Sequence, residues 1–465
     1  MDNKRERLGS RLGFILLSAG CAIGIGNVWK FPYVAGQNGG GAFVLIYLVF
    51  LAIMGIPIMS MEFSLGRAAQ LSPAKLYHKL EPKGTKWHAH GYISLIGNVM
   101  LMMFYTTVSG WMLIYFCYFL GGKFTKGMSA DAVGGVFDGM LANPWLLILF
   151  VGIVTLVGFL VCSFNVQNVL EKISKVMMTA LLVLIIILVI NSFTLEKSGE
   201  ALKFYLIPDF TKVTFATVSA AMCQAFFTLS LGIGSMAIFG SFLSKDRALL
   251  GESINVALLD TFVAIASGLI IFPAVFTHTD LYSGDAINTD LAAGPGLIFN
   301  TLPQVFNNMW GGRVWGTLFF LFMSFAALST IFAVFQNILS CTQDMFGWSK
   351  KKACIIDGIA IFLLSIPCAL GFNVLSGVSF GKVGGILDFE DYIVSNILLP
   401  GGSLLIVLFC TLKKGWGFDN YMLEANTGKG VRVKRWMKYY MKFVLPFIIL
   451  AIWFVSLVGP FVDFV

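Results

Sequence analysis

The sequence predicts an all-α polytopic membrane protein, and three features of its composition indicate this fold class. Hydrophobic residues make up 57% of the 465 residues, only 12% are charged, and the mean hydropathy is +0.84. Soluble domains carry roughly 25% charged residues, so this chain lacks the charge to cover a surface that faces water. The apolar residues also fall into blocks of about 20, the length at which a helix crosses the hydrocarbon core. These features argue against a soluble enzyme, a disordered chain and a secreted disulfide scaffold.

Eleven apolar segments satisfy this length requirement, and polar or glycine- and proline-rich stretches separate them. We expect the spans at residues 11–34, 42–67, 92–120, 144–164, 173–191, 213–243, 253–276, 314–343, 353–371, 392–411 and 441–462. The eight cysteines form no CxxC pair and mostly lie inside these segments, which favours small buried residues over a disulfide framework. The first segment carries no cleavage pattern, so we expect it to be a span and not a signal peptide.

The placement of basic residues predicts the orientation of the chain. With a cytoplasmic N-terminus, the N-terminal tail, the inner loops and the inner ends of the spans hold 24 of the 32 Lys and Arg, as the cytoplasmic side of membrane proteins does. The long stretch 277–312 has no Lys or Arg and carries Asp280, Asp285 and Asp290. We therefore expect a multi-pass protein of the plasma (cytoplasmic) membrane, with the C-terminus outside. The basic loops account for the net charge of +8, so no nucleic-acid partner is expected.

Two spans contain glycine-rich interruptions at corresponding positions. The first span contains GCAIGIGN at residues 20–27, and the sixth contains TLSLGIGS at residues 228–235. Unwound backbone inside a bilayer is tolerated only where other groups complete its hydrogen bonds. A single glycine pair is commonly explained by close helix packing. Two interruptions in register are instead typical of inverted-repeat transporters with a binding site at the membrane midplane.

This pattern predicts one transporter domain over residues 1–465. Its parts are a cytoplasmic N-terminal tail at 1–10, a first repeat of spans one to five at 11–192, a second repeat of spans six to ten at 213–412, and an eleventh span at 441–462. The expected fold class is therefore an all-α membrane protein with a 5+5 inverted-topology repeat, broken helices 1 and 6, and one further span.

The combination of five motifs along the chain is specific to one protein family. They are GCAIGIGNVWKFP at 20–32, NGGGAF at 38–43, GIP at 55–57 with Glu62 following, QAFFTLSLG at 224–232 and AALST at 326–330. Over essentially the whole chain these stretches resemble the neurotransmitter:sodium symporter family, and in particular its bacterial amino-acid-transporting members, which include the bacterial leucine transporter. The resemblance implies a symporter and not an enzyme. Glu62 would hydrogen-bond the unwound part of the sixth span, as its family counterpart does.

The resemblance implies two sodium sites and no organic cofactor. The first site would use the carbonyl of Ala22, the side chain of Asn27, Thr228, Asp260 and the substrate carboxylate. The second site would use the carbonyls of Gly20, Ile23 and Ala326 with the hydroxyls of Ser329 and Thr330. The sequence itself supports the second site, because Ser329 and Thr330 place two adjacent hydroxyl groups inside an apolar helix, and sodium prefers oxygen ligands. Their alternative role is hydrogen bonding back to carbonyls of their own helix.

Asp260 departs from the family pattern. Most members carry Asn at this position, and the residue four positions later, acidic in the leucine transporter and Ser in chloride-dependent relatives, is Ala264. An acid inside a membrane is expensive and usually functional. Because a carboxylate and a chloride ion can balance the same cations, we expect Asp260 to replace chloride and make transport chloride-independent. A purely structural hydrogen-bonding role for Asp260 is the alternative.

The resemblance also assigns a substrate pocket. The matching positions are Ala22, Gly24, Ile25, Gly26, Leu101, Tyr105, Phe226, Phe227, Thr228, Ser230, Ile233, Thr330 and Val334. Amine-transporting relatives have Asp at the position of Gly24, so glycine there points to amino acids. The side chains around the substrate are apolar, which favours a hydrophobic amino acid. Aliphatic and aromatic substrates both remain open.

Four charged residues would form the gates. By resemblance, Lys30 and Asp391 form the outer gate, and Arg5 and Asp344 form the inner gate. The family usually has Arg at the Lys30 position, and Lys lacks the bidentate fork of Arg, so we expect a looser or water-bridged outer gate. Interfacial snorkelling is the alternative for Lys30 and Arg5.

These observations predict sodium-coupled symport of a neutral, hydrophobic L-amino acid into the cell by alternating access. The expected partners are the amino acid, the lipid bilayer and, left open, a second copy of the chain in a homodimer. The alternatives are a non-transport intramembrane protein and a cation channel that uses the same carbonyl cage. A symporter saturates and concentrates its substrate on a sodium gradient, whereas a channel does neither.

Overall fold

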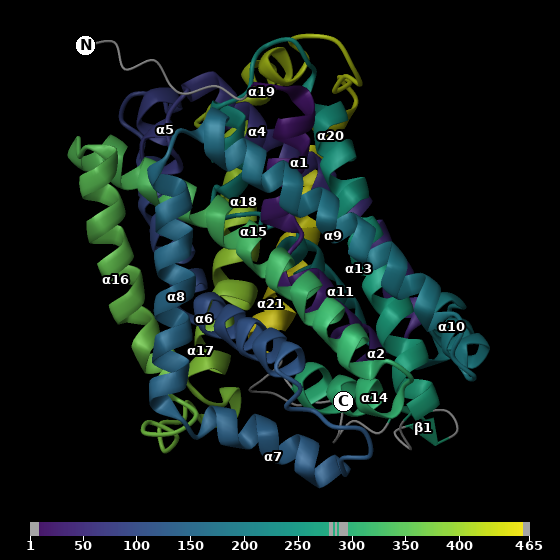
Figure 1. The fold of residues 1–465 in the computed structure, drawn as a ribbon. Coiled ribbons are helices and arrows are strands. Elements are labelled where there is room, and N and C mark those ends of the chain that lie inside the picture. The colour runs from purple at the N-terminus through teal and green to yellow at the C-terminus, as the bar shows by residue number, and fades with distance from the viewer. Residues whose placement is uncertain (1–8, 279–281, 284–285, 288–295, 459–465) are drawn as a thin grey trace.

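The structure is a computed structural model that describes residues 9–278, 282–283, 286–287 and 296–458. In these ranges the chain forms a bundle of helices with one short antiparallel hairpin, β1 (Tyr282–Ser283) and β2 (Ala286–Ile287). Long helices run between two ends of the molecule (Figure 1). At one end lie the short helices α5 (Pro73–Leu80) and α19 (Phe418–Ala425), and at the other lies α7 (Ala130–Leu141). The all-helical fold class is confirmed.

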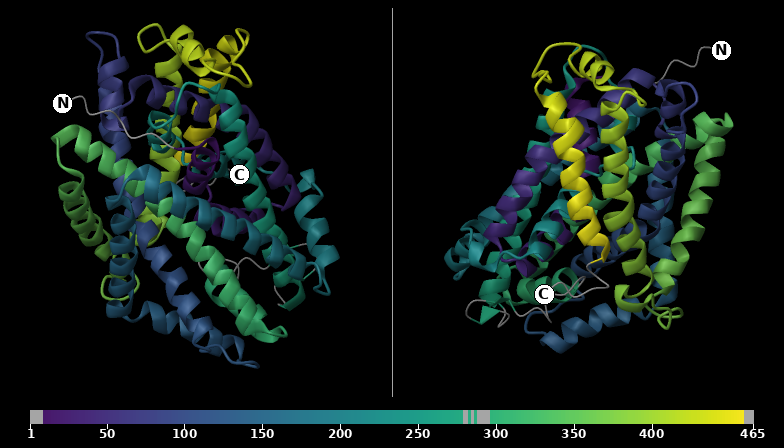
Figure 2. Two further views of the ribbon diagram at one scale, coloured as in Figure 1. Left: turned by 45° about the horizontal axis from the view of Figure 1, so that its top comes forward. Right: turned by 180° about the vertical axis from the view of Figure 1, so that it is seen from behind.

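Within the residues that the structure describes, nine continuous helical runs are long and apolar enough to cross a membrane. They are α3–α4 (Gly41–Ala69), α6 (His88–Leu120), α8 (Pro144–Ser163), α9 (Glu171–Ser192), α13 (Leu249–His278), α15 (Gly312–Phe346), α16 (Lys350–Leu370), α17–α18 (Ile386–Thr411) and α20–α21 (Met437–Val458). Seen from behind, α21 (Leu445–Val458) runs from the α19 end toward the α7 end (Figure 2). These nine runs match nine of the expected spans.

The two interrupted spans differ from the rest. The first consists of α1 (Arg11–Ala22) and a second helical piece over Gly26–Gln37, bent by 55° relative to α1, and it brings the number of spans to ten. The sixth consists of α11 (Phe215–Thr228) and α12 (Ser235–Ser241). Because α11 has 14 residues and α12 has seven, neither crosses a bilayer alone. In the described ranges, length and composition therefore support ten of the eleven expected spans, and the sixth span, formed by α11 and α12, remains a prediction.

Several helices contain wide π-helical turns directly before a proline, which the sequence analysis did not predict. Five π-helical segments lie directly before an X-Pro pair: Gly26–Lys30, Leu51–Gly55, Leu297–Thr301, Ile393–Leu398 and Tyr440–Val444. Proline has no N–H and its ring clashes with the carbonyl four residues earlier. An i→i+5 turn relieves this clash without breaking the span. The continuous run Ile386–Thr411 begins six residues before the expected start of span ten. Asp391 therefore lies within α17 (Ile386–Tyr392) and not before the span.

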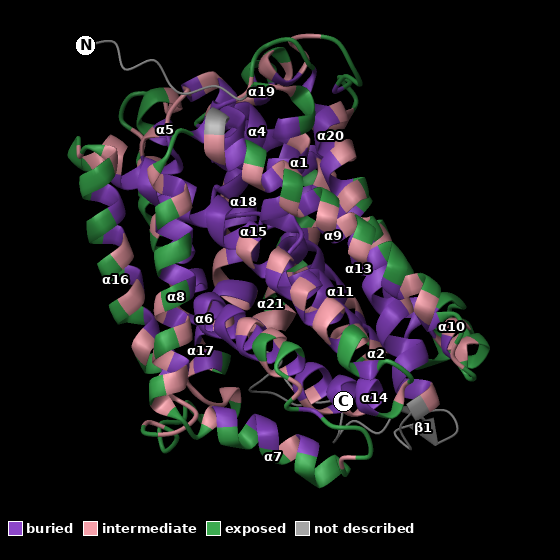
Figure 3. Cartoon of the chain, in the orientation of Figure 1, coloured by how far each residue is buried: buried purple, intermediate pink, exposed green. Residues whose placement is uncertain are grey.

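The helices divide into a buried centre and an outer layer (Figure 3). In α15, 78% of the most apolar stretch is buried, against 28% in α9 and 39% in α8 and α16. The outer helices expose Leu, Ile and Val, which are suited to lipid. The central position of α15 places its hydroxyl-bearing face against α1, so the tertiary fold brings the predicted sodium ligands together.

The segments between spans contain short helices that the sequence analysis did not predict. They are α5, α7, α10 (Ser198–Leu206), α14 (Leu302–Asn308) and α19, with 3₁₀ turns at Phe210–Lys212 and Gly381–Val383 and a π turn at Val166–Leu170, whereas α2 (Phe31–Gln37) is the end of the first span. The long helix α6 also begins earlier than expected, at His88, so His90 is a buried helical residue.

Candidate functional site

The first span unwinds where the GIG motif lies. α1 ends at Ala22, and Ile23 adopts an extended conformation. The peptide N–H groups beyond it are bonded by side chains: Ile25 N–H donates to Tyr105 Oη at 2.9 Å, and Gly24 N–H donates to Asn27 Oδ1 at 3.2 Å. A Cβ at Gly24 would overlap the Tyr105 hydroxyl and lie 2.5 Å from Thr330 Oγ1. Only glycine fits here, which accounts for the absence of the Asp found in amine-transporting relatives.

The sixth span unwinds between Leu229 and Gly234. Ser230 has φ 51°, Gly232 φ 94° and Gly234 φ 73°, all left-handed, a conformation that costs little only for glycine. Glu62 of α4 (Ile56–Ala69), itself fully buried, accepts from Gly232 N–H at 2.6 Å and from Met236 N–H at 3.2 Å. The carboxylate therefore satisfies peptide donors at the start of α12, where the helix dipole also favours an anion.

The two breaks touch each other at the centre of the bundle. Ser230 Oγ donates to the Cys21 carbonyl at 3.3 Å, and Gln224 Nε2 donates to the Gly26 carbonyl at 3.0 Å. A Cβ at Gly26 would lie 2.6 Å from the Phe227 ring. Unwound backbone from chain segments about 200 residues apart is thus buried together, away from lipid.

The predicted ligands of the second sodium site converge. Thr330 Oγ1 lies 3.2 Å from the Gly20 carbonyl, 3.3 Å from that of Cys21 and 3.4 Å from that of Ile23. Ser329 Oγ lies 3.3 Å from the Ile23 carbonyl and 2.9 Å from that of Ala326. Each hydroxyl carries one hydrogen and can serve only one of these carbonyls fully. Oxygens therefore outnumber donors, an arrangement that suits a cation with oxygen ligands.

The predicted ligands of the first sodium site form a hydrogen-bonded cluster around Asp260 of α13. Asn27 Nδ2 donates to Asp260 Oδ1 at 2.7 Å and to its carbonyl at 3.2 Å, and Thr228 Oγ1 donates to Asp260 Oδ2 at 3.0 Å. The carboxylate is fully buried, as is Asn27. Ala22 lines the adjoining cavity. Asp260 thus joins the breaks of both spans, and it supplies a carboxylate within reach of both Asn27 and Thr228.

A small cavity lies between the breaks. Its volume is about 20 Å³ and its lining is Cys21, Ala22, Gly24, Gly26, Leu101, Tyr105, Phe227, Ser230, Ile233, Thr330 and Leu399. Nine of these are predicted pocket residues, and Cys21 and Leu399 are additions. Of the other predicted residues, Phe226, Thr228 and Val334 are buried behind the lining, and Ile25 faces the larger cavity above. Sequence reasoning missed Leu399 because it lies after the π segment of span ten.

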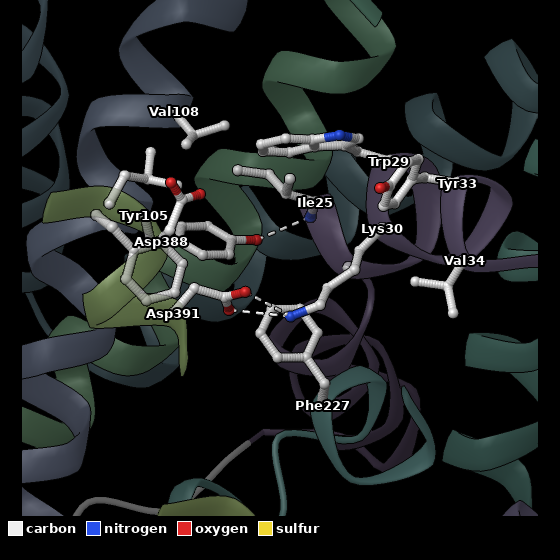
Figure 4. Close-up of a pocket in the computed structure, with 13 residues that line it drawn as sticks. Ile25, Trp29, Lys30, Tyr33, Val34, Tyr105, Val108, Phe227, Asp388 and Asp391 are labelled. Atoms are coloured by element: carbon white, nitrogen blue, oxygen red, sulfur yellow. Dashed lines mark hydrogen bonds and ion pairs between the residues drawn. The ribbon is translucent and has the colours of Figure 1, made fainter. Parts of the chain in front are cut away.

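A larger cavity of about 240 Å³ shares Gly26, Tyr105 and Phe227 with the small one, and the two residues of the predicted outer gate, Lys30 and Asp391, belong to its lining (Figure 4). Lys30 Nζ lies 3.0 Å and 2.8 Å from the two carboxylate oxygens of Asp391, and 3.0 Å from Ser395 Oγ. It also sits over the Phe227 ring, 4.2 Å from its centre. The contact is direct, so the expectation of a looser or water-bridged gate does not hold in this structure. Ser395 is a gate contact that the sequence analysis missed.

Only one of the two residues of the predicted inner gate, Asp344, lies in the part of the chain that the structure describes. Arg5 lies outside the described residues, and Asp344 Oδ2 accepts from Ser72 N–H at 2.7 Å. Two buried acids anchor the start of α1. Glu252 binds Arg11 at 3.0 Å, and Glu171 accepts from Gly9 N–H at 2.7 Å. Neither acid was predicted, since both lie at span ends, where charges are ordinarily solvated.

A further ion pair closes the same end of the bundle. Arg67, the last residue of the second predicted span, has a side chain that is 0% exposed and pairs with Glu424 of α19 at 2.6 Å. It also donates to the Arg247 carbonyl at 2.6 Å and to the Glu424 carbonyl. Arg67 therefore holds α19 against the end of α4, a role that no local sequence pattern reveals.

This geometry defines a class of protein. A helical bundle with two broken spans, whose unwound segments meet at buried oxygen clusters and a cavity with a gated entrance, has the architecture of a secondary transporter.

Comparison with known proteins identifies the family. The sequence profile described as the sodium:neurotransmitter symporter family matches residues 5–127 and 139–461. The chain is 35% identical to the sodium-dependent transporter YhdH of Bacillus subtilis, over 98% of this chain and 99% of that protein. It is 25% identical to the human sodium- and chloride-dependent taurine transporter, over 98% of this chain and 78% of that one. A crystal structure of MhsT in complex with L-phenylalanine matches with a TM-score of 0.86 and 37% identity, over 97% of this chain and 99% of the other.

The chain belongs to the sodium:neurotransmitter symporter family. It is therefore a multi-pass membrane protein of a family of sodium-dependent transporters, and it is not an enzyme.

Proposed function

We propose that this protein couples the inward movement of sodium to uptake of a neutral, hydrophobic L-amino acid by alternating access. One observation carries the proposal: the unwound segments of the first and sixth spans meet, with Tyr105 at Ile25 N–H and oxygen clusters on either side. A substrate carboxylate would be bound beside the Tyr105 hydroxyl and Ile25 N–H, at the N-terminal end of the second half of the span, where the helix dipole favours an anion, and sodium would be bound by the carbonyls. If the substrate carboxylate also contacts sodium, each ligand raises the affinity for the other by the same factor.

The apolar lining supports a hydrophobic side chain on the substrate. Leu101, Phe227 and Ile233 line the small cavity, and Val334 lies one helical turn beyond Thr330. MhsT was crystallised with L-phenylalanine, which supports the same substrate class. A cavity of about 20 Å³ holds about one water molecule. Binding of an amino acid would therefore require the two broken spans to move apart.

The orientation, the repeats and the span count belong to the same proposal. We infer a cytoplasmic N-terminus, inverted repeats at 11–192 and 213–412, and an eleventh span at 441–462. The length of the broken sixth span supports this count, because residues 215–241, which hold α11 and α12, are long enough to cross a bilayer although neither helix is so alone.

The experiment that tests the proposed function is uptake into liposomes containing the purified protein. With an inward sodium gradient, labelled leucine or phenylalanine should accumulate above the external concentration and saturate, and both effects should vanish when potassium replaces sodium. Binding of all twenty amino acids with and without sodium then identifies the substrate. Passage without saturation or accumulation would favour the channel alternative.

Thr330→Val should weaken sodium binding while leaving the fold intact. The substitution removes a hydroxyl that faces three carbonyls and keeps the shape of the side chain. One polar contact to a charged group corresponds to roughly a tenfold change in affinity. The sodium concentration for half-maximal uptake should rise by that factor. Thr330→Ser should restore it, and Ser324→Ala, which removes a buried hydroxyl of the same helix bonded to Phe320, should change nothing. Equal sodium dependence of the Val and Ser variants would contradict the second site.

A further inference from the structure

A groove runs along the outer face of the bundle between α8 and α16, and its lining shares no residue with the two cavities of the transport site. These two helices lie side by side at the edge of the molecule (Figure 1). The groove has a volume of about 590 Å³, and its middle is lined by Leu156, Phe159, Ile355, Ile359 and Phe362. Leu156 is 69% and Ile355 63% exposed. Its walls therefore face the hydrocarbon of the membrane, and its natural occupant is apolar.

One end of the groove is basic. α16 begins with Lys350, Lys351 and Lys352, and of these Lys351 lines the groove. Lys350 Nζ donates to the Phe164 carbonyl at the end of α8, at 2.5 Å, and Lys352 Nζ lies over the Trp348 ring, 5.3 Å from its centre. Lys351 is exposed, and among the described residues it has no ion-pair partner. Its ammonium is thus available to a negatively charged group at the membrane surface.

The dimensions of the groove match one lipid chain. From Lys351 to Phe362 the helix advances eleven residues, or about 16 Å at the α-helical rise. One leaflet contributes about half of the roughly 30 Å hydrocarbon core. A chain that starts at the level of Lys351 would end near the bilayer midplane, where Phe362 narrows the groove against Gly152.

We propose that this groove binds an anionic phospholipid, with its phosphate at Lys351 and one acyl chain along α8 and α16. Basic pockets between spans at a membrane surface select anionic headgroups, and the first turn of α16 adds the positive end of the helix dipole. Asp357, the acid nearest this turn along α16, is bonded to Thr342 Oγ1 at 2.7 Å and does not line the groove. A second copy of the chain fits less well, because a two-fold interface on this face would bring two Lys350–Lys352 clusters to the same level.

Native mass spectrometry of the purified protein tests this proposal. Phosphatidylglycerol and phosphatidylcholine with identical acyl chains are titrated separately. The protein should retain phosphatidylglycerol about fivefold more strongly, the contribution expected of one lysine at an anionic surface. Lys351→Gln should remove this preference and Lys351→Arg should keep it. Lys413→Gln, at another exposed lysine, should behave as wild type. Ile355→Trp, which places a large ring one turn behind Lys351, should reduce retention of both lipids.

Three results would overturn the proposal. They are equal retention of the two lipids by the wild-type protein, equal effects of Lys351→Gln and Lys413→Gln, and a dimer that excludes both lipids but dissociates in the Ile355→Trp variant. The last result would make the groove a contact between copies of the chain. Since no variant touches the transport site, none of these outcomes depends on the proposed function.

Discussion

Asn27→Ala should abolish sodium-dependent uptake. In the structure the Asn27 amide connects the break of the first span to Asp260, through contacts of 2.7 Å and 3.2 Å, and it bonds the peptide N–H of Gly24. Alanine removes the proposed sodium ligand and one of the two side chains that donate to the buried Asp260 carboxylate, leaving Thr228 as the other. Loss of a hydrogen bond to a buried charge is costly, so the first sodium site should lose its geometry and its affinity together. Uptake of labelled amino acid into liposomes on a sodium gradient should fall to the level of empty liposomes.

The matched control is Asn38→Ala. Asn38 also uses its amide to bond backbone, with Nδ2 donating to the Val34 carbonyl at 2.9 Å, but it lies at the end of α2, outside the site. Its uptake should stay close to wild type. Monodisperse elution of both variants would separate loss of transport from loss of folding. Normal sodium-dependent transport by Asn27→Ala would show that the first site is misassigned.

Asp260→Asn should convert a chloride-independent transporter into one that needs chloride. Wild-type uptake should be the same in chloride and in gluconate, because the Asp260 carboxylate supplies the negative charge beside the proposed sodium site. Asparagine keeps the size of the side chain and can still bond Asn27 and Thr228, whose contacts with Asp260 are 2.7 Å and 3.0 Å. It removes the charge, so an external anion must balance the cations. We expect uptake by this variant to fall at least about tenfold in gluconate, since charge interactions in a poorly hydrated site exceed 1.4 kcal/mol.

A second buried acid provides the control for this experiment. Asp357 of α16 bonds Thr342 at 2.7 Å and lies away from both broken spans, so Asp357→Asn should leave the anion dependence unchanged. Two outcomes would refute the role of Asp260. One is wild-type uptake that stops in gluconate. The other is an Asp260→Asn variant that transports equally in both salts.

Much of the architecture can be predicted from the sequence, because it depends on residue patterns that extend over only a few positions along the chain. Apolar blocks of span length fixed the helical fold class, and the GIG motifs located both breaks, since glycine tolerates the conformations that unwound backbone requires. The sequence analysis did not predict the five π-helical segments that lie directly before an X-Pro pair, although proline gives each of them a local cause. The hydroxyl pair Ser329–Thr330 also stands out in an apolar helix. In all these cases the cause lies within a few residues along the chain.

Other features depend on contacts between distant segments, and only the tertiary structure decides them. Asn27 and Asp260 are 233 residues apart, and Arg67 and Glu424 are 357 apart. Whether a buried charge finds a partner depends on which helices pack together, and packing is set by the whole bundle. The direct Lys30–Asp391 contact, the small volume of the central cavity and the buried anchors of α1 at Glu171 and Glu252 have the same origin. The sequence by itself determined where the backbone is left unpaired, and the tertiary structure decided what lies opposite each unpaired group.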